Sequence, residues 1–390
     1  MMKKIIFLCF FIGSIGFFST TIKAQSNDSA RLQFSILTCE AGEDIYTVWG
    51  HTAIRVIDST HQTDYVFNYG TFDFDEPFFI TKFVKGSLKY FISVNNFSDF
   101  YNLYQAEKRN IKEQVINLSI TEKAKWYEAL KVNLVDSNRY YLYNFITDNC
   151  TTRVKDGLFK NTHYQPNPTT TLSFREKVVA APYQKGIPWI GLGIDLLLGA
   201  YSDQKPLEMH AGFLPDLLFD QLAQVKKLVK STHVYQFTTA SENANTNTKS
   251  KVPFFTLLGF LAFYLILTIV KNRFTIIASK IVDIALLLTF TIGGSLMFYM
   301  CHISLHTACY QNFNLMWMHP LYLIALITYF IKNQWIESIA KVFLGAIIGL
   351  LLACFWLPQH FSQEIFLLIA IALILNYRLI LKGQNNIATK

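Results

Sequence analysis

Five apolar stretches in the second half of the chain restrict its fold more than any other feature of the sequence. They cover residues 254–270, 281–300, 315–331, 339–357 and 365–381. Each is close to the ~20 residues that an α-helix needs to cross the ~30 Å hydrocarbon core of a bilayer. Apolar residues make up 52% of the chain, which is more than a soluble protein usually contains. The sequence therefore predicts an all-α membrane domain of five transmembrane helices over residues 254–390.

Basic residues between and after these stretches indicate their orientation. The loops at 301–314 and 358–364 contain no lysine or arginine. The other loops and the C-terminal end carry basic residues, among them Lys271, Arg273, Lys332, Lys341, Arg378 and Lys382. Because lysine and arginine concentrate in cytoplasmic loops, we expect the C-terminus in the cytoplasm and residues 25–252 on the opposite side of the membrane.

The N-terminus has the pattern of an export signal. Lys3 and Lys4 precede an apolar run from Ile5 to Phe18, and a short polar segment ends at Ala24. Residues 1–24 are therefore predicted to be a signal peptide, which also means that the next domain is exported. A segment rich in Ser, Asn, Thr and Lys at 241–253 predicts a linker, so that the exported domain covers residues 25–240.

The net charge of +8 does not indicate a nucleic-acid partner. The sequence has no basic stripe with interleaved aromatic residues, which nucleic-acid binding usually requires. Lysines in the cytoplasmic loops and contact with anionic headgroups account for the excess charge. The partner that composition predicts is the membrane, and no cofactor is predicted.

Residues 25–240 have the mixed pattern of an α+β domain. Alternating or β-branched runs predict strands at 31–39, 51–57, 65–69, 89–94 and 140–146, and apolar periodicity predicts helices at 98–109 and 121–134. A further helix is expected to begin at Cys150, after the polar turn 147–149. The glycine-rich apolar segment 187–200 is too short to span a bilayer. We interpret it as part of the domain core, or alternatively as a surface that enters the headgroup region.

Cys150 and His51 are the candidates for chemistry. A cysteine is nucleophilic as the thiolate, and a nearby imidazole or a helix N-terminus lowers the pKa of the thiol. Cys150 is predicted at a helix N-terminus, where backbone N–H groups can also form an oxyanion hole. The alternatives are a Cys39–Cys150 disulfide, which an oxidising compartment permits, and a structural role for His51.

A second group of such side chains lies in the exterior loop 301–314, which contains Cys301, His302, His306 and Cys309. Metal binding is disfavoured because the four residues are crowded and lack the usual separated ligand pairs. A Cys301–Cys309 disulfide and a simple interfacial loop are the alternatives. We predict no metal site.

Three segments carry a resemblance to a known family: Trp49–Arg55, Asn68–Phe74 and Asp148–Asp156. They are similar to the Lnb-type lipoprotein N-acyltransferases of Gram-negative bacteria. The similarity continues through 193–199, 209–216, 305–307 and 312–317, so it extends over most of the chain. The block around Cys150 is its most specific part.

The resemblance implies a permuted papain-like (NlpC/P60-like) domain, similar to lecithin:retinol acyltransferase, in which His51 precedes Cys150. It also implies a reaction. A fatty acyl chain would move from a phospholipid acyl donor, through a Cys150 thioester, to the α-amine of the N-terminal cysteine of a diacylated lipoprotein acceptor.

A third catalytic residue would hold the imidazole in one tautomer. The permuted relatives supply it from the strand after the histidine strand, which implies Asn68 or Asp64; Glu43 and Asp44 are weaker candidates. Asn68 and Asp64 share one strand face, and Asn68 is preferred because it belongs to the family-like block. The residues expected to bind substrate are Asn149, Arg153 and His306.

Two other functions are compatible with the same residues. A permuted cysteine peptidase or amidase that cleaves cell-wall peptides would use the same nucleophile and base, with water as the second substrate. A non-catalytic, membrane-anchored assembly or sensor protein would use His51 and Cys150 only as structural residues.

Overall fold

The computed structural model describes residues 29–165, 173–204, 211–237, 251–331 and 335–388. The chain forms two compact units. The first contains Met1–Pro77, Leu88–Thr170 and Leu207–Asn243, and the second contains Phe78–Ser87, Thr171–Pro206 and Ala244–Lys390. The predicted signal peptide and most of the predicted linker lie outside the described residues. Two segments of the predicted exported domain, 78–87 and 171–206, therefore belong to the unit that contains the apolar helices.

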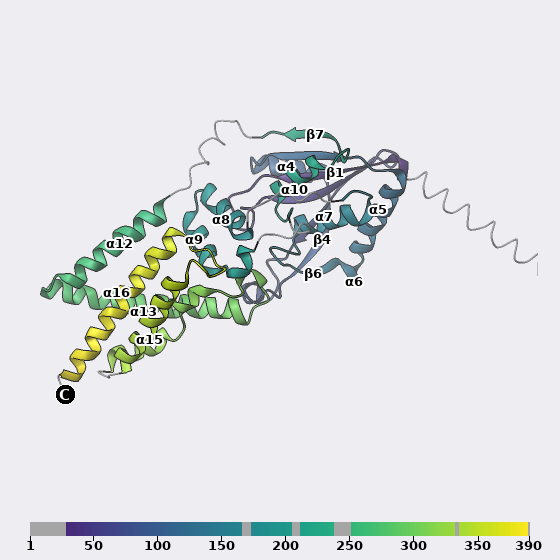
Figure 1. Cartoon of the computed structure of the whole chain (residues 1–390). Helices are drawn as coiled ribbons and strands as arrows, with labels where there is room; N and C mark the ends of the chain where they lie inside the picture. The colour runs from purple at the N-terminus through teal and green to yellow at the C-terminus, as the bar shows by residue number, and fades with distance from the viewer. Residues whose placement is uncertain (1–28, 166–172, 205–210, 238–250, 332–334, 389–390) are drawn as a thin grey trace, which may run out of the picture. The chain divides into compact units, whose positions relative to one another are not determined.

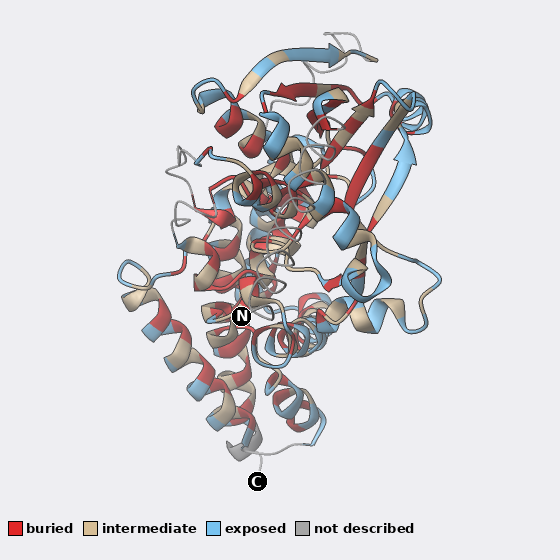
Figure 2. Cartoon of the chain, turned by 90° about the vertical axis from the view of Figure 1, so that its right-hand side faces the viewer, coloured by how far each residue is buried: buried red, intermediate tan, exposed pale blue. Residues whose placement is uncertain are grey.

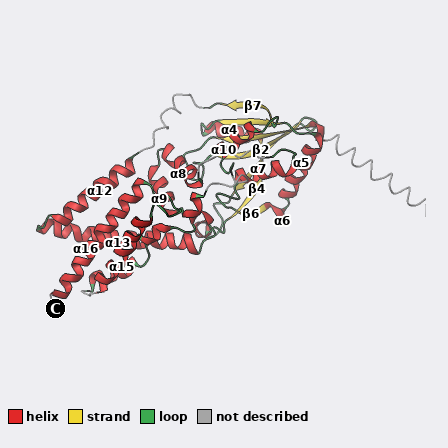
Figure 3. Ribbon diagram, viewed as in Figure 1, coloured by secondary structure: helices red, strands yellow, loops and turns green. Residues whose placement is uncertain are grey.

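The first unit is built on one antiparallel sheet in the order β6-β4-β3-β2-β1-β5-β7 (Figure 3). The strands are β1 (Leu32–Cys39), β2 (His51–Asp58), β3 (Thr63–Thr71), β4 (Lys89–Asn96), β5 (Ile111–Ile116), β6 (Tyr140–Leu142) and β7 (Val229–Tyr235). The central strands are mostly buried, whereas the edge strand β7 is largely exposed (Figure 2). The predicted α+β character is thus present, and the strands expected around His51 are those at the centre of the sheet.

Helices cover both faces of this sheet (Figure 1). They are α4 (Phe97–Ala106), α5 (Ile120–Leu134), α6 (Asp136–Arg139), α7 (Cys150–Asn161) and α10 (Pro215–Gln224). On one face the ring of Phe34 stacks on Trp126 of α5, with centroids 4.9 Å apart. On the other face Leu37 packs with Phe100 of α4. Because residues 34 and 37 point to opposite sides of β1, the sheet lies between these helices.

The predicted strand over 140–146 ends early, at Leu142. The side-chain oxygen of Asn144 accepts hydrogen bonds from the backbone N–H groups of Ile146 and Thr147, both at 3.0 Å. Such local bonds stabilise a turn in competition with a β-ladder. The chain after β6 therefore turns directly into α7.

The second unit is helical. Its elements are α3 (Phe79–Lys85), α8 (Phe174–Gln184), α9 (Pro188–Leu197), α12 (Val252–Ile269), α13 (Arg273–His302), α14 (Tyr322–Phe330), α15 (Trp335–Ala353) and α16 (Gln363–Ala388). Four of the described helices, α12, α13, α15 and α16, are long and apolar enough to cross a membrane. Asp283 of α13 and Arg378 of α16 form a paired double hydrogen bond at 2.8 and 2.9 Å. This ion pair joins two of the candidate spans.

The structure does not confirm a fifth span at 315–331. That stretch begins with a 3-10 turn, Phe313–Met316, and Pro320 directly precedes Leu321, the N-cap of its α-helix. Its helix, α14, has nine residues and reaches only about 14 Å. The structure therefore confirms four of the five predicted spans and leaves the fifth a prediction.

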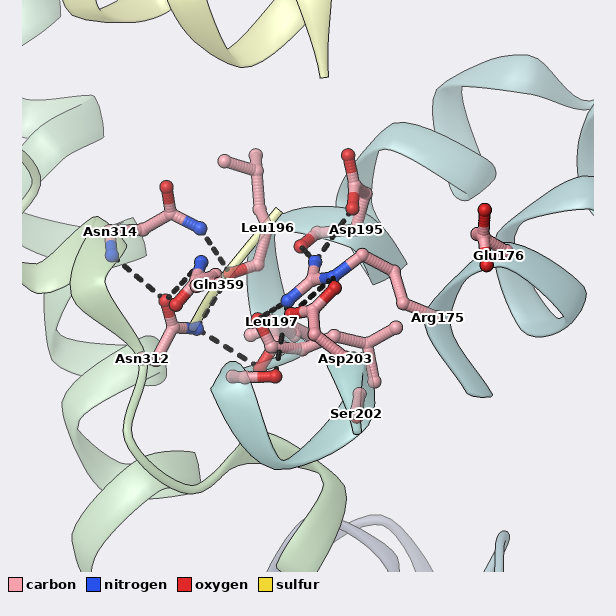
Figure 4. Close-up of polar contacts among 12 residues, drawn as sticks. Arg175, Glu176, Asp195, Leu196, Leu197, Ser202, Asp203, Asn312, Asn314 and Gln359 are labelled. Carbon is pink, nitrogen blue, oxygen red and sulfur yellow. Dashed lines mark hydrogen bonds and ion pairs between the residues drawn. The ribbon is translucent and has the colours of Figure 1, made fainter. Parts of the chain in front are cut away.

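A buried arginine organises the segment before the membrane helices (Figure 4). Arg175 of α8 is 2% exposed and donates to the carboxylates of Asp195, at 2.7 Å, and Asp203, at 2.9 Å. The same guanidinium donates to the backbone carbonyls of Leu198 and Gly199. Every arm of the guanidinium is thus used inside the protein, which indicates a structural role.

The loop after α13 caps the C-terminal end of α9 (Figure 4). The amide of Asn312 donates to the carbonyls of Leu196 and Leu197, and the amide of Asn314 donates to Leu196. These carbonyls have no partner inside a helix that ends here. A Cβ on Gly199 would lie 1.9 Å from the carbonyl oxygen of Tyr310, so only glycine fits. The segment predicted as domain core is therefore a short helix locked into the second unit.

Candidate active site

The site lies where β2 and α7 both begin, because His51 is the first residue of β2 and Cys150 is the first residue of α7. The hydroxyl groups of Thr52 and Thr151, the next residue of each element, are hydrogen-bonded at 3.0 Å. This buried contact fixes the two element starts side by side. The structure therefore brings together the histidine and cysteine that the sequence singles out.

Asn149 is the N-cap of α7. Its Oδ1 accepts the backbone N–H groups of Thr151 and Thr152 at 2.8 and 2.9 Å, and the Thr152 hydroxyl accepts the N–H of Asn149 in return. Its Nδ2 donates to the carbonyls of Phe145 and Phe213. All polar atoms of this buried side chain are engaged, so the expected contact of Asn149 with substrate does not fit the structure. Its role is to position the helix that carries Cys150.

Gly70 of β3 makes room for the nucleophile. Its φ is +87°, and a Cβ at this position would lie 3.3 Å from the Cβ of Cys150. Any other residue would be strained in this backbone conformation and would also press on the cysteine. Gly70 therefore allows α7 to start directly against the sheet.

The electrostatics of the site favour an ion pair. Burial raises the pKa of the Cys150 thiol, but the charge of His51, a hydrogen bond to its ring and the backbone N–H of Thr52 outweigh burial, so the pKa lies below its ordinary value. Burial lowers the pKa of His51, whereas the Cys150 charge and the hydrogen bond to it raise that pKa above the ordinary value. The two shifts have one cause, a thiolate beside an imidazolium.

Asn68 is the residue that contacts the other side of the imidazole. Its Oδ1 lies 3.1 Å from Nε2 of His51, which leaves Nδ1 for the thiol. The Nδ2 of Asn68 lies 3.4 Å from the carbonyl oxygen of Val66, which can only accept a hydrogen bond. This contact orients the amide so that Oδ1 faces the ring and accepts from Nε2–H.

Asp64, the alternative to Asn68, has a different partner. It lies four residues earlier on β3, and its carboxylate accepts two hydrogen bonds from Arg55, at 2.8 and 2.6 Å. Arg55 also binds the buried carboxylate of Glu113 at 2.9 Å. The structure thus assigns Asp64 to an ion-pair network and not to His51. Glu43 and Asp44, the weaker candidates, lie in the exposed turn before β2.

The disulfide alternative is contradicted, because Cys39 and Cys150 are both free. Burial raises the pKa of Cys39 to about 12 against the opposing effect of a hydrogen bond with Tyr104. Cys301 and Cys309 of the second unit are also free. The described residues contain no group of three or more His, Cys, Asp or Glu that could hold a metal ion.

Several aromatic side chains next to the nucleophile were not predicted as part of the site. Burial raises the pKa of Tyr141 and of Tyr143 well above 10, and the charge of Cys150 adds to both shifts, so both phenols stay neutral. The rings of Trp49 and Phe145 meet edge to face at 4.7 Å and connect the loops that precede His51 and Cys150. The aromatic run 140–145 could have indicated these side chains, but the same run is also typical of an ordinary β-strand.

Arg153 and His306 are placed as follows. The guanidinium of Arg153 forms two hydrogen bonds with Asp148 and lies 3.8 Å from the ring centre of Tyr141, and its side chain is partly exposed. His306 belongs to the second unit, where its Nε2 lies 2.8 Å from the carbonyl oxygen of Phe83. Contact of either residue with substrate stays a prediction.

The described chain thus combines a sheet domain, in which a thiol, an imidazole and an amide form a hydrogen-bonded chain, with helices suited to a membrane. Two family models match it: the Lnb N-terminal periplasmic domain over residues 19–173 and the Lnb transmembrane domain over residues 245–385. Together they cover most of the sequence. No curated protein and no solved structure gives a significant match.

The chain belongs to the Lnb family, as the motifs around His51, Asn68 and Cys150 predicted. It is a multi-pass inner-membrane protein with a periplasmic N-terminal domain.

Proposed function

We propose that this protein is a membrane-bound acyltransferase. It moves a fatty acyl chain from a phospholipid to the α-amine of the N-terminal cysteine of a diacylated lipoprotein, through a thioester on Cys150. The observation that carries the proposal is the Cys150–His51–Asn68 chain, in which the thiol pKa is lowered and the imidazole pKa is raised. Its place in a periplasmic domain of the Lnb family, followed by membrane helices, supports a lipid substrate.

In the first step the Cys150 thiolate attacks the carbonyl carbon of a phospholipid ester. A C–S bond forms, and the oxygen of the tetrahedral intermediate needs hydrogen-bond donors. The cap residue Asn149 uses the N–H groups of Thr151 and Thr152, which leaves the N–H of Cys150 itself as a donor at this helix start. The C–O bond then breaks, and His51 gives its proton to the departing lysophospholipid oxygen.

In the second step the lipoprotein amine attacks the thioester carbonyl. His51 accepts the proton of the amine, a C–N bond forms and the C–S bond breaks, which returns the thiolate of Cys150. Asn68 holds the imidazole in the tautomer that both steps use. Arg153, which is partly exposed one helical turn after Cys150, is proposed to contact the substrate.

Two structural assignments belong to the same proposal. We assign the first unit to the permuted papain-like (NlpC/P60-like) class, because a strand that begins with the histidine packs against a helix that begins with the cysteine. We also place the C-terminus in the cytoplasm, because Lys271 lies between α12 and α13, Arg273 is the first residue of α13, and Lys382 lies in the last two turns of α16.

Intact-mass analysis of the purified protein in phospholipid nanodiscs tests the proposal. We expect a mass increase of one fatty acyl group on Cys150, which neutral hydroxylamine removes because it cleaves thioesters. Cys150→Ala must abolish the adduct, whereas Cys39→Ala, the matched control, must retain it. Adding a diacylated lipoprotein must discharge the adduct and yield the N-acylated product.

Other outcomes identify the alternatives. Release of cell-wall peptides by the protein, without any acyl adduct, would indicate the peptidase or amidase. Fully N-acylated lipoproteins in cells whose sole copy carries Cys150→Ala would indicate a non-catalytic protein.

A further inference from the structure

Helix α3 is unusual because none of its residues is buried. The side chains of Phe78, Ile80 and Phe83 are 80%, 75% and 50% exposed. A short helix in a folded protein normally buries its apolar side chains against the core. A contiguous group of exposed large apolar residues instead marks a contact surface.

Hydrogen bonds fix α3 to the loop that follows α13. The backbone N–H of Leu305 donates to the carbonyl of Lys85 at 2.9 Å, and Nε2 of His306 donates to the carbonyl of Phe83 at 2.8 Å. All four residues belong to the second unit. These hydrogen bonds therefore fix α3 in its exposed position.

The loop that holds α3 lies at the end of a candidate membrane span. Helix α13 ends at His302, and the next apolar side chains, Ile303 and Leu305, are 55% and 49% exposed. Because α3 falls within the match to a periplasmic domain, this end of α13 lies on the periplasmic side. A segment bonded to the end of a spanning helix is at the depth of the membrane interface.

The composition of α3 suits that depth. Its sequence, FITKFVK, combines apolar side chains with Lys82 and Lys85 and contains no acidic residue. Interfacial helices place apolar residues at the acyl-chain boundary and lysines among the headgroup phosphates. The long lysine stem lets the ammonium reach a phosphate while the apolar residues stay in the lipid.

We propose that α3 and residues 303–306 form a lipid-contact surface that inserts Phe78, Ile80 and Phe83 into the periplasmic leaflet of the bilayer. The continuity of this surface with the end of α13 identifies phospholipid as its occupant. The segment leaves the sheet shortly after β3, the strand that contains Asn68 and Gly70.

Depth-dependent fluorescence quenching in nanodiscs tests this surface. The full chain carries Cys150→Ala, so that the result does not depend on the proposed acyl transfer, and a fluorescent amino acid replaces Ile80. The matched control carries the same probe at Val132, an apolar residue of α5 in the first unit that is 53% exposed. With phospholipids brominated near the headgroup, we expect a loss of fluorescence at position 80 and none at position 132.

Three outcomes would overturn the proposal. Equal fluorescence at position 80 in brominated and ordinary lipid would place α3 in water, and an equal loss at both positions would show that the signal is not specific. A loss that requires added lipoprotein would identify a protein partner. Hydrogen exchange of the unaltered chain provides a check without substitution, because residues 79–85 should exchange more slowly in nanodiscs than in a lipid-free amphipathic polymer.

Discussion

Replacing Asn68 by alanine tests whether its amide orients the imidazole of His51. The substitution removes the acceptor 3.1 Å from Nε2 of His51. Asn68 is only 8% exposed, so water does not readily take its place. We expect the ring to lose both a fixed tautomer and part of the stabilisation of its charged form.

The magnitude follows from the kind of bond that is lost. A hydrogen bond to a charged group contributes about 1.5–3 kcal/mol. The hydrogen bond with Asn68 is one of the interactions that raise the pKa of His51, so its loss should lower that pKa. The thiolate–imidazolium pair exists above the lowered pKa of Cys150 and disappears as pH rises through the raised pKa of His51. Asn68→Ala should therefore lower the upper pH limit of the range in which the thiolate–imidazolium pair exists.

The assay is the rate of Cys150 acylation in nanodiscs as a function of pH, with alkylation by iodoacetamide as a lipid-free measure of thiolate. For Asn68→Ala, the alkaline limb of the acylation profile should move to lower pH and the maximal rate should fall on the order of tenfold, as expected for about 1.4 kcal/mol. Asp64→Asn should leave the profile in place, because Asp64 is bonded to Arg55. An unchanged profile in Asn68→Ala, or the same shift in Asp64→Asn, would refute the reasoning.

Two further predictions concern the support of the site and of the second unit. Gly70→Ala should lower the free energy of unfolding by about 1–2 kcal/mol, because the positive φ strains any residue with a Cβ, and it should also slow alkylation of Cys150. Gly193→Ala, at a position with open space around it, is the control in both thermal unfolding and alkylation. Arg175→Met should lower the free energy of unfolding in detergent by about 3–5 kcal/mol, because Asp203 and a second buried carboxylate lose their partner, and an unchanged unfolding midpoint would contradict this.

The features that the sequence predicts well are local. The start of β2 at His51 and the start of α7 at Cys150 follow from alternation and from turn residues within a few positions. Four membrane helices follow from apolar length alone. The fifth predicted span, 315–331, is not confirmed, because its described α-helix covers only Tyr322–Phe330 and follows a 3-10 turn.

The features that the sequence does not predict depend on distant partners. Strand parity places Asp64 and Asn68 on the same face of β3, so it does not show which of them contacts His51. Arg55 of the neighbouring strand binds Asp64, which leaves Asn68 as the partner of the imidazole. The role of Asn149 could have been found, since Asn149 and Thr152 have the spacing of a capping box. Residues 78–87 belong to the second unit because of bonds with residues more than two hundred positions later, which no local pattern contains.

The two cysteines of the first unit show why position alone does not identify a nucleophile. Cys39 lies directly opposite His51 in the β1–β2 ladder, so the two residues are direct cross-strand neighbours. Its thiol is nevertheless held neutral, because it is buried among apolar side chains and its pKa rises to about 12. Cys150 is only partly buried, and the imidazole and the N–H of Thr52 are directed at its sulfur, so its pKa falls. The two cysteines therefore differ in the groups that stabilise the thiolate. For Cys150 these groups are the ring of His51 and the N–H of Thr52, and the close packing of the start of α7 against Gly70 brings the sulfur within their reach.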